Sequence, residues 1–160
     1  MLSVYLICVG KLKEKFYQEA CAEYVKRLSA YCRLTLVELP EEKLPQAPSQ
    51  GQIDQALARE AAAIRAKLPP SAVLAALCVE GRMRSSEELA QLVGTWEQSS
   101  AKHLVFLIGG SYGLHPSIKA EAQVKLSMSC LLYTSDAADV MLLEQIYRAF
   151  KIREGSSYHK

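Results

Sequence analysis

Two hydrophobic periodicities alternate along this chain. Apolar runs rich in β-branched residues, most of them closed by glycine or proline, predict strands over 1–10, 33–40, 71–81, 103–110 and 124–129. Between them, amphipathic spacing predicts helices over 13–31, 52–67, 85–96, 116–123 and 140–152. This alternation predicts an α/β fold in which helices cover both faces of a mostly parallel sheet. The continuous apolar runs at 72–79 and 104–108 agree, because central parallel strands are buried on both faces.

Local signals place the faces and ends of the predicted helices. In the first helix the apolar side chains recur at every fourth residue, at Phe16, Ala20, Tyr24 and Leu28. In the last helix they share one face, at Val140, Leu143, Tyr147 and Phe150. Ser85 and Glu88 have the spacing of a capping box, and the three prolines within 40–51 predict a loop or lid.

Composition restricts the class of protein. The 160 residues fit a single domain over 1–160, with 50% hydrophobic and 22% charged residues, as in ordinary globular chains. The net charge of +2 is compatible with a nucleic-acid partner but far too small to indicate one. The apolar runs are well short of the roughly 20 residues of a membrane span, so the sequence predicts no membrane association.

The cysteines predict neither a metal site nor a disulfide framework. Their number is odd, and none forms a CxxC pair or a Cys/His ligand spacing. The five are Cys8, Cys21, Cys32, Cys78 and Cys130. Cys8 and Cys78 lie inside apolar runs and are expected to be core thiols. Together with the absence of a recognisable signal peptide, this usage favours a reducing cytoplasm.

Two glycine turns follow predicted strands, at Glu80-Gly81 and at Gly109-Gly110. In open α/β sheets, ligands bind beyond the carboxyl ends of strands, and glycine lets a ligand approach the backbone. The second turn reads GGSYG, which fits neither the GxGxxG dinucleotide fingerprint nor a GxxxxGK[ST] phosphate loop. The residues alone leave open an ordinary tight turn, a flavodoxin-like nucleotide-binding domain, or a turn that holds another cofactor.

Candidate catalytic groups are sparse in this sequence. No Ser/His/Asp order and no metal-ligand cluster stands out. His103 begins a predicted strand and His115 precedes a predicted helix, positions where histidine is more often structural than catalytic. Tyr158 and His159 follow the last predicted helix, and a chain end is usually frayed and inert.

Several stretches, taken in order, resemble one family. VGKLKEKFYQEACAEYVKRL, VFLIGGSYGLH, LSMS and LLEQIYRAFKIREGSSYHK resemble the small SPOUT-class methyltransferases that methylate N3 of a pseudouridine in 23S rRNA. The resemblance covers nearly the whole chain. It implies a trefoil knot near the C-terminal end of the sheet, with S-adenosylmethionine held in the loops of the knot. It also implies a cytoplasmic homodimer whose substrate is 23S rRNA within the assembled ribosome.

The resemblance, carried over position by position, implies a cofactor site. Leu77 and Gly109 would contact S-adenosylmethionine, and the segment 128–133 would close over it. The residues of that segment are Met128, Ser129, Cys130, Leu131, Leu132 and Tyr133.

The same resemblance implies an active site shared between two subunits. Tyr158 and His159 would lie near the cofactor of the other subunit, with His159 as a general base or as a group that positions RNA. Arg148 is a candidate contact for RNA phosphate, although its position four residues after Glu144 favours an ion pair along the helix.

Residues 130–139, CLLYTSDAAD, depart from the family pattern, which resembles KMTFPHQLAR at this place. The proline, histidine and arginine of the pattern are replaced by Thr134, Ser135 and Asp139, which removes a rigid turn and reverses a charge beside an anionic substrate. The segment also matches the residues that one reads from TGT CTC TTA TAC ACA TCT GAC GCT GCC GAC, a transposase sequencing adapter. We interpret it as adapter sequence within a genuine gene. If the segment is native, the alternative is a non-catalytic ribosome-binding or RNA-binding protein that keeps the knot.

Overall fold

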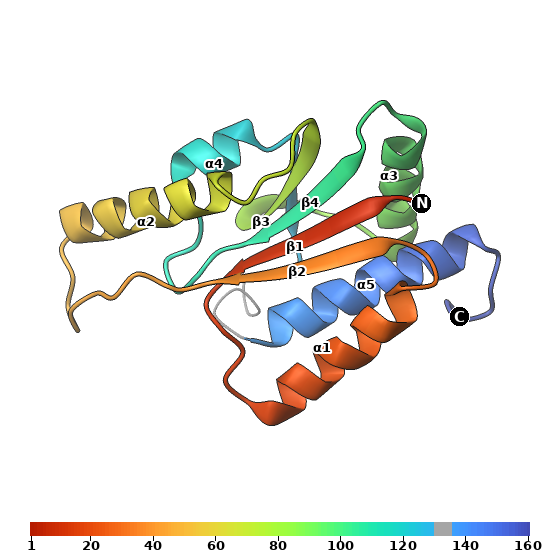
Figure 1. Cartoon of the computed structure of the whole chain (residues 1–160), viewed down its shortest axis with the longest axis horizontal. Helices are drawn as coiled ribbons and strands as arrows, with labels where there is room; N and C mark the ends of the chain where they lie inside the picture. Colours follow the sequence, from red (N-terminus) through yellow and green to blue (C-terminus); the bar gives the residue numbers. More distant parts are fainter. Residues whose placement is uncertain (130–135) are drawn as a thin grey trace.

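The computed structural model describes residues 1–129 and 136–160. These residues form a parallel sheet of five strands in the order β2-β1-β4-β3-β5 (Figure 1). The strands are β1 (Ser3–Val9), β2 (Arg33–Leu39), β3 (Ala72–Met83), β4 (His103–Ile108) and β5 (Val124–Ser127). Each pair of neighbouring strands runs in the same direction. The predicted parallel α/β sheet is therefore confirmed.

Helices cover both faces of the sheet, as predicted (Figure 1). They are α1 (Lys15–Leu28), α2 (Gln50–Arg65), α3 (Ser86–Gln98), α4 (Pro116–Glu121) and α5 (Ala137–Arg153). Helices α1, α3 and α5 pack on one face, and α2 and α4 on the other. Because side chains alternate along a strand, β1 sends Leu6 and Cys8 into the first layer and Ile7 and Val9 into the second.

The predicted core face of the first helix is wrong at its N-terminal end. Phe16 is 61% exposed, whereas Cys21 and Leu28 of α1 are buried. A strict four-residue repeat drifts by about 40° per step on a helix of 3.6 residues per turn, so Phe16 points about 120° away from Leu28. The observed core face passes instead through Tyr17, Cys21, Tyr24, Val25 and Leu28.

Strand β3 is buried on both faces for only part of its predicted length. Leu74 and Cys78 are buried, but Val79 is 58% exposed. The strand bulges here, and the residues on either side of the bulge, Leu77 and Arg82, are both paired with Leu126 of β5. A Cβ atom on Gly81 would lie 2.5 Å from the backbone carbonyl carbon of Leu126, so glycine is required for this close approach. The bulge brings the end of β3 around β5.

The predicted capping box at the start of α3 is confirmed. The Ser85 hydroxyl accepts a hydrogen bond from the Glu88 N–H at 3.1 Å, and the Glu88 carboxylate accepts one from the Ser85 N–H at 2.8 Å. We expect Ser85→Ala to lower the free energy of unfolding by about 1 kcal/mol, because one helix N–H loses its acceptor. Urea denaturation measures this difference. Ser100→Ala, at an exposed position, serves as the control, and equal losses in both variants would contradict the role of the cap.

Candidate functional site

Two hollows lie at the carboxyl ends of the strands. The first, which we call the β3–β5 pocket, has a volume of about 290 Å³. Its walls come from the ends of β3 and β5, the first turns of α3, and the N-terminal half of α5. Leu77 and Met128, two predicted cofactor contacts, both line this pocket. The structure thus brings together residues 51 positions apart in the sequence that were predicted to share a ligand.

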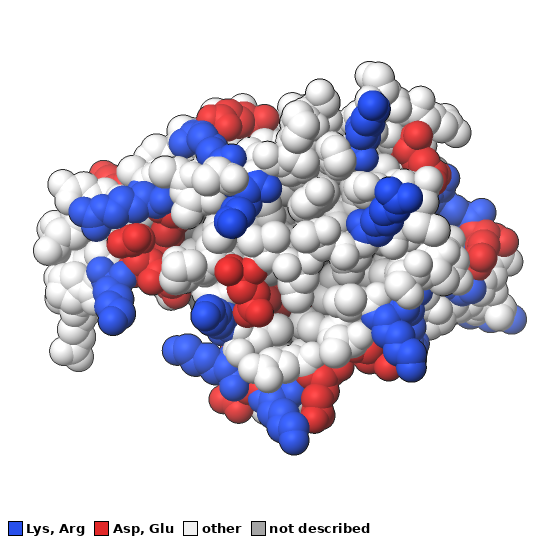
Figure 2. Space-filling model, in the orientation of Figure 1, with Lys and Arg blue, Asp and Glu red and all other residues white. Residues whose placement is uncertain are grey.

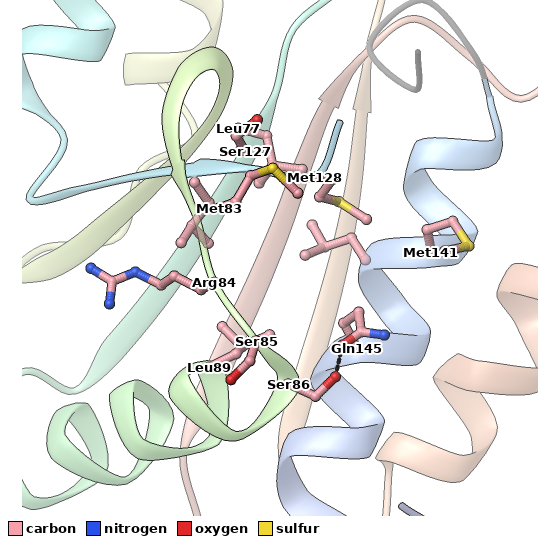
Figure 3. Close-up of a pocket in the computed structure, with 12 residues that line it drawn as sticks. Leu77, Met83, Arg84, Ser85, Ser86, Leu89, Ser127, Met128, Met141 and Gln145 are labelled. Carbon is pink, nitrogen blue, oxygen red and sulfur yellow. Dashed lines mark hydrogen bonds between the residues drawn. The ribbon is translucent and has the colours of Figure 1, made fainter. Parts of the chain in front are cut away.

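The β3–β5 pocket is mostly apolar, with a polar bridge at one side (Figure 3). Met83, Met128 and Met141 present flexible thioether side chains that adapt to the shape of an organic ligand. The Ser86 hydroxyl donates to the amide oxygen of Gln145 at 2.7 Å and links α3 to α5. Apart from Leu77 and Met128, the sequence analysis missed these residues, because only the folded chain brings α3 and α5 to the ends of β3 and β5.

The second hollow, which we call the β1–β4 pocket, has a volume of about 450 Å³. Gly10 and Gly109, just beyond the ends of β1 and β4, both line it. The chain leaves β1 through α1 on one face and leaves β4 through α4 on the opposite face. Such a change of direction between neighbouring strands is where α/β sheets bind ligands. The predicted contacts Leu77 and Gly109 therefore lie in separate hollows, at the ends of the neighbouring strands β3 and β4.

The glycine turn after β4 is tightly closed. The Gly113 N–H donates to the Gly110 carbonyl at 3.0 Å, and Gly113 has a φ of +78°. A Cβ atom on Gly109 would lie 2.3 Å from the carbonyl carbon of Gly113. Residue 109 must therefore be glycine for the turn to close, and Gly109, Gly110 and Ser111 of the turn line the β1–β4 pocket.

Arg148, Tyr158 and His159, the predicted catalytic residues, lie together. The Arg148 guanidinium pairs with the Glu144 carboxylate at 2.5 Å, which confirms the predicted ion pair along the helix. It also lies 5.1 Å from the centre of the Tyr158 ring, and the Tyr158 hydroxyl donates to Glu144 at 3.2 Å. Burial, followed by the hydrogen bond with Tyr24, raises the pKa of Tyr158 to about 12. Tyr158 is therefore held as a neutral phenol at physiological pH.

Both ring nitrogens of His159 are engaged. Nδ1 lies 3.2 Å from Arg148 Nη1, and Nε2 lies 2.6 Å from the Glu87 carboxylate. Because a guanidinium only donates, Nδ1 accepts, and the proton of a neutral imidazole is on Nε2. The pKa of Glu87 is lowered to about 2 by its own backbone N–H and by His159 and Ser85, so Glu87 is a charged acceptor. The C-terminal tail is thus docked on α3 and α5 of its own chain.

The remaining predicted residues fall at the edge of the described structure. Ser129 is the last described residue before 130–135, and Cys130, Leu131, Leu132 and Tyr133 lie outside the described residues.

The two other histidines occupy the structural positions expected of them. His103 begins β4, and His115 caps α4 by accepting the Ser117 N–H on Nδ1 at 3.1 Å.

Neither a metal centre nor a membrane helix is found in the described parts of the chain. Residues 1–129 and 136–160 contain no group of three or more His, Cys, Asp or Glu side chains arranged to hold a metal ion. Within the same ranges, no helix has the length and apolar character needed to cross a bilayer. Four cysteines, Cys8, Cys21, Cys32 and Cys78, are buried free thiols.

Comparison with known proteins places this arrangement in a family. Residues 2–159 match the family model described as "Predicted SPOUT methyltransferase". The chain is 42% identical over 159 residues to the ribosomal RNA large subunit methyltransferase H of Leuconostoc mesenteroides, covering 99% of this chain and 100% of that protein.

Of two solved structures that resemble this chain, the first shares its fold. A "probable methylase family protein" from Haemophilus influenzae Rd KW20 superposes on all of this chain and 72% of its own, with a TM-score of 0.53 and 15% identity. The SpoU methyltransferase AviRb from Streptomyces viridochromogenes, solved with AdoMet, covers 97% of this chain and 59% of its own, with a TM-score of 0.42 and 14% identity. The family match over nearly the whole length shows that this chain belongs to the SPOUT methyltransferases, enzymes that take the transferred methyl group from S-adenosylmethionine.

Proposed function

We propose that the protein methylates N3 of a pseudouridine in the 23S rRNA of the large ribosomal subunit. The observation that carries this proposal is the 42% identity, over the full length of both chains, to a methyltransferase named for large-subunit ribosomal RNA. The atom and the nucleotide follow from the resemblance of the glycine turn and of the ending EQIYRAFKIREGSSYH to the N3-specific branch of the family.

S-adenosylmethionine, when bound, supplies an electrophilic methyl group. Leu77 and Met128, which line the β3–β5 pocket, would hold it on the side of β3 and β5, and Gly109 on the side of β4. Ser129 follows Met128 in the chain and would continue this side of the site. The apolar lining of the β3–β5 pocket fits the flat adenine ring of this ligand, and the close-packed glycine turn lets its polar groups approach the backbone. The predicted contacts at 130–133 would complete the site. We also propose that this region forms the family's trefoil knot, and the passage of β3 around Leu126 supports this.

Methylation at N3 requires that the imide nitrogen lose its proton before its lone pair attacks the methyl group. His159 is the proposed general base. In the observed conformation its Nδ1 lone pair is directed at Arg148 and its Nε2 carries a proton. His159 must therefore leave Arg148 before Nδ1 can accept a proton, which fits a tail that moves on forming a shared active site. Arg148 would keep its ion pair with Glu144, and its Nη1, once released by His159, could donate to RNA phosphate.

We propose that the active protein is a cytoplasmic homodimer. Val79, Met83 and Met141 are 58%, 69% and 42% exposed, and the two methionines lie at the β3–β5 pocket. Large apolar side chains exposed beside a ligand pocket are typical of a surface that another subunit covers. The four buried thiols agree with a reducing cytoplasm.

The charge distribution supports recognition of folded RNA by shape. On the face shown in Figure 2, lysine and arginine side chains are scattered with acidic side chains among them, and they do not form one continuous basic surface. Lys11 and Lys13 line the β1–β4 pocket and form no ion pair within the described residues. Contacts with RNA backbone and shape, supplemented by such lysines, fit a structured ribosomal substrate.

A methyl-transfer assay tests this function. Ribosomal large subunits and intact ribosomes would be incubated with the protein and labelled S-adenosylmethionine, and the nucleosides analysed by mass spectrometry. Two proteins are compared: the chain with CLLYTSDAAD at 130–139, and a version carrying KMTFPHQLAR there. We expect N3-methylpseudouridine from the second protein, with turnover at least about tenfold lower in the first. Absence of methyl transfer by both proteins would overturn the proposal.

A non-catalytic ribosome-binding protein is the second candidate. The observation that favours it is Asp139, which is 7% exposed at the start of α5, where the family pattern has a cation. Binding of S-adenosylmethionine and ribosomes without methyl transfer by either version would identify this function.

The role of His159 gives a separate prediction. We expect His159→Ala, made in the protein with KMTFPHQLAR at 130–139, to lower kcat by about 100-fold or more, because loss of a general base removes its contribution to proton transfer. The pH dependence of single-turnover methylation should lose its base-dependent limb at the same time. Lys160→Ala changes the adjacent tail residue and serves as the control. Unchanged kcat in the His159 variant would exclude it as the base.

A further inference from the structure

A carboxylate from a distant loop holds the glycine turn. Glu41, at the start of the proline-rich segment after β2, accepts a hydrogen bond from the Ser111 N–H on Oε1 at 2.6 Å. The two residues are 70 positions apart in the sequence. Within residues 1–129 and 136–160, this is the side-chain hydrogen bond that reaches the backbone of 109–113. Glu41 also lines the β1–β4 pocket, together with Gly109.

Gly110 has no side chain at the place where the Glu41 carboxylate lies. A Cβ atom at position 110 would lie 2.7 Å from Glu41 Oε1 and 2.9 Å from its carboxyl carbon. The backbone φ of Gly110 is not in the left-handed region, so its conformation alone does not demand glycine. A Cβ atom at position 110 would therefore displace the Glu41 carboxylate from its place beside the turn.

The segment that carries Glu41 is itself anchored. The next residue, Glu42, donates its N–H to Glu60 Oε2 at 3.1 Å, and Glu60 is a buried residue of α2. On the other side, the Leu39 carbonyl accepts from the Gly10 N–H at 2.7 Å. Hydrogen bonds therefore hold the backbone on both sides of Glu41, at Leu39 and at Glu42. This restricts the movement of Glu41 and of the turn that it contacts.

We infer that Glu41 is a positioning residue for the cofactor site: through the Ser111 N–H it holds the turn containing Gly109 in the conformation that binds S-adenosylmethionine. The inference rests on the proposed role of Gly109 in cofactor binding. A turn already held in its binding conformation loses less entropy when the ligand binds, so removal of Glu41 weakens binding without removing a direct contact. Glu41 acts as a hydrogen-bond acceptor in this role, and its charge is not required.

Three substitutions separate this role from its alternatives. Glu41→Ala removes the acceptor, Glu41→Gln keeps an acceptor oxygen without the charge, and Gly110→Ala blocks the approach of the carboxylate. Glu42→Ala is the matched control, because that side chain pairs with Arg59 at the surface at 3.5 Å and does not reach the turn. Each variant is made in the protein with KMTFPHQLAR at 130–139, and thermal denaturation confirms that it folds.

Two measurements test the inference. Hydrogen exchange of the cofactor-free protein reports on the Ser111 amide directly, and calorimetry gives the Kd for S-adenosylmethionine. We expect Glu41→Ala and Gly110→Ala to speed Ser111 exchange and raise the Kd about tenfold, while Glu41→Gln and Glu42→Ala stay within about twofold of the unsubstituted protein.

The outcomes that overturn the inference are distinct from failure of the proposed function. Unchanged or tighter binding by Glu41→Ala would show that Glu41 is dispensable or occupies the place of a ligand group. Equal losses in Glu41→Gln and Glu41→Ala would show that the negative charge is required, which contradicts a role as a simple hydrogen-bond acceptor. If the unsubstituted protein binds no S-adenosylmethionine, the proposed function fails and the inference with it.

Discussion

Substitution of Gly109 by alanine should abolish measurable binding of S-adenosylmethionine and lower the free energy of unfolding by about 3 kcal/mol. The new Cβ atom would lie 2.3 Å and 2.4 Å from the carbonyl carbon and oxygen of Gly113, and 2.8 Å from the Leu114 nitrogen. All three are backbone atoms, so no side-chain rotation relieves the contact. The turn must open, which breaks the hydrogen bond from the Gly113 N–H to the Gly110 carbonyl. Calorimetric titration and urea denaturation measure the two effects.

Two other glycines provide controls for this prediction. Gly51 lies in the first turn of α2, where a Cβ atom would be 4.0 Å from its nearest neighbour, so Gly51→Ala should stabilise the protein by about 0.5 kcal/mol. Gly113 has open space around it but a φ of +78°, so Gly113→Ala should cost about 1 kcal/mol through backbone strain alone. If Gly109→Ala unfolds like Gly113→Ala and binds the cofactor normally, the turn is not closed as described.

The strands and helices could be predicted because their signals are local. Ser85 and Glu88 are three residues apart, and their capping box formed as the spacing indicates. The predicted core face of α1 was wrong at Phe16, because the difference between a four-residue repeat and the 3.6 residues of a helical turn accumulates over three turns. The bulge in β3 could not be predicted, because it depends on Leu126 passing beside Gly81 from 45 residues away in the chain.

The candidate site was predicted where a motif or a resemblance marked it. Gly109 follows an apolar strand, and Arg148, Tyr158 and His159 belong to a recognisable ending. Glu41 carries no such signal, since a glutamate in a proline-rich loop is ordinary until the fold places it beside Ser111. The apolar walls contributed by Met83 and Met141 were missed for the same reason. Contacts between distant segments depend on topology, which periodicity does not determine.

A buried carboxyl group at the start of α5 should make the stability of the protein depend on pH. Asp139 is 7% exposed, and burial, with Asp136 and Glu38 nearby, raises its pKa from 3.8 to about 6 even though Cys8 donates a hydrogen bond to it. Below pH 3.8 the carboxyl is protonated in both states and costs nothing. As the pH rises towards 6 the unfolded chain ionises first, so the unfolded state is favoured and stability falls. The full cost above pH 6 is about 3 kcal/mol.

Asp139→Asn should therefore stabilise the chain with CLLYTSDAAD at 130–139. The gain in free energy of unfolding should be near zero at pH 4 and rise to about 3 kcal/mol at pH 7.5, because the amide never ionises. Urea denaturation of the unsubstituted protein and of Asp139→Asn at several pH values gives the difference between their free energies of unfolding. The contributions of the other titrating groups are the same in both proteins and cancel in this difference. Asp54→Asn, at an exposed aspartate of α2, serves as the control for the substitution itself. A constant difference for Asp139→Asn would mean that its carboxyl is not buried.

The same experiment bears on the origin of residues 130–139. Among the described residues, the groups that shift the pKa of Asp139 are Cys8, Asp136 and Glu38, and none of them is a cation. A native sequence rarely buries a carboxylate without a cation beside it, whereas a segment derived from adapter sequence carries whatever residues its codons specify. Replacing all of 130–139 by KMTFPHQLAR should then stabilise the protein at pH 7.5 at least as much as Asp139→Asn does. A loss of stability on that replacement would show that CLLYTSDAAD is adapted to this fold.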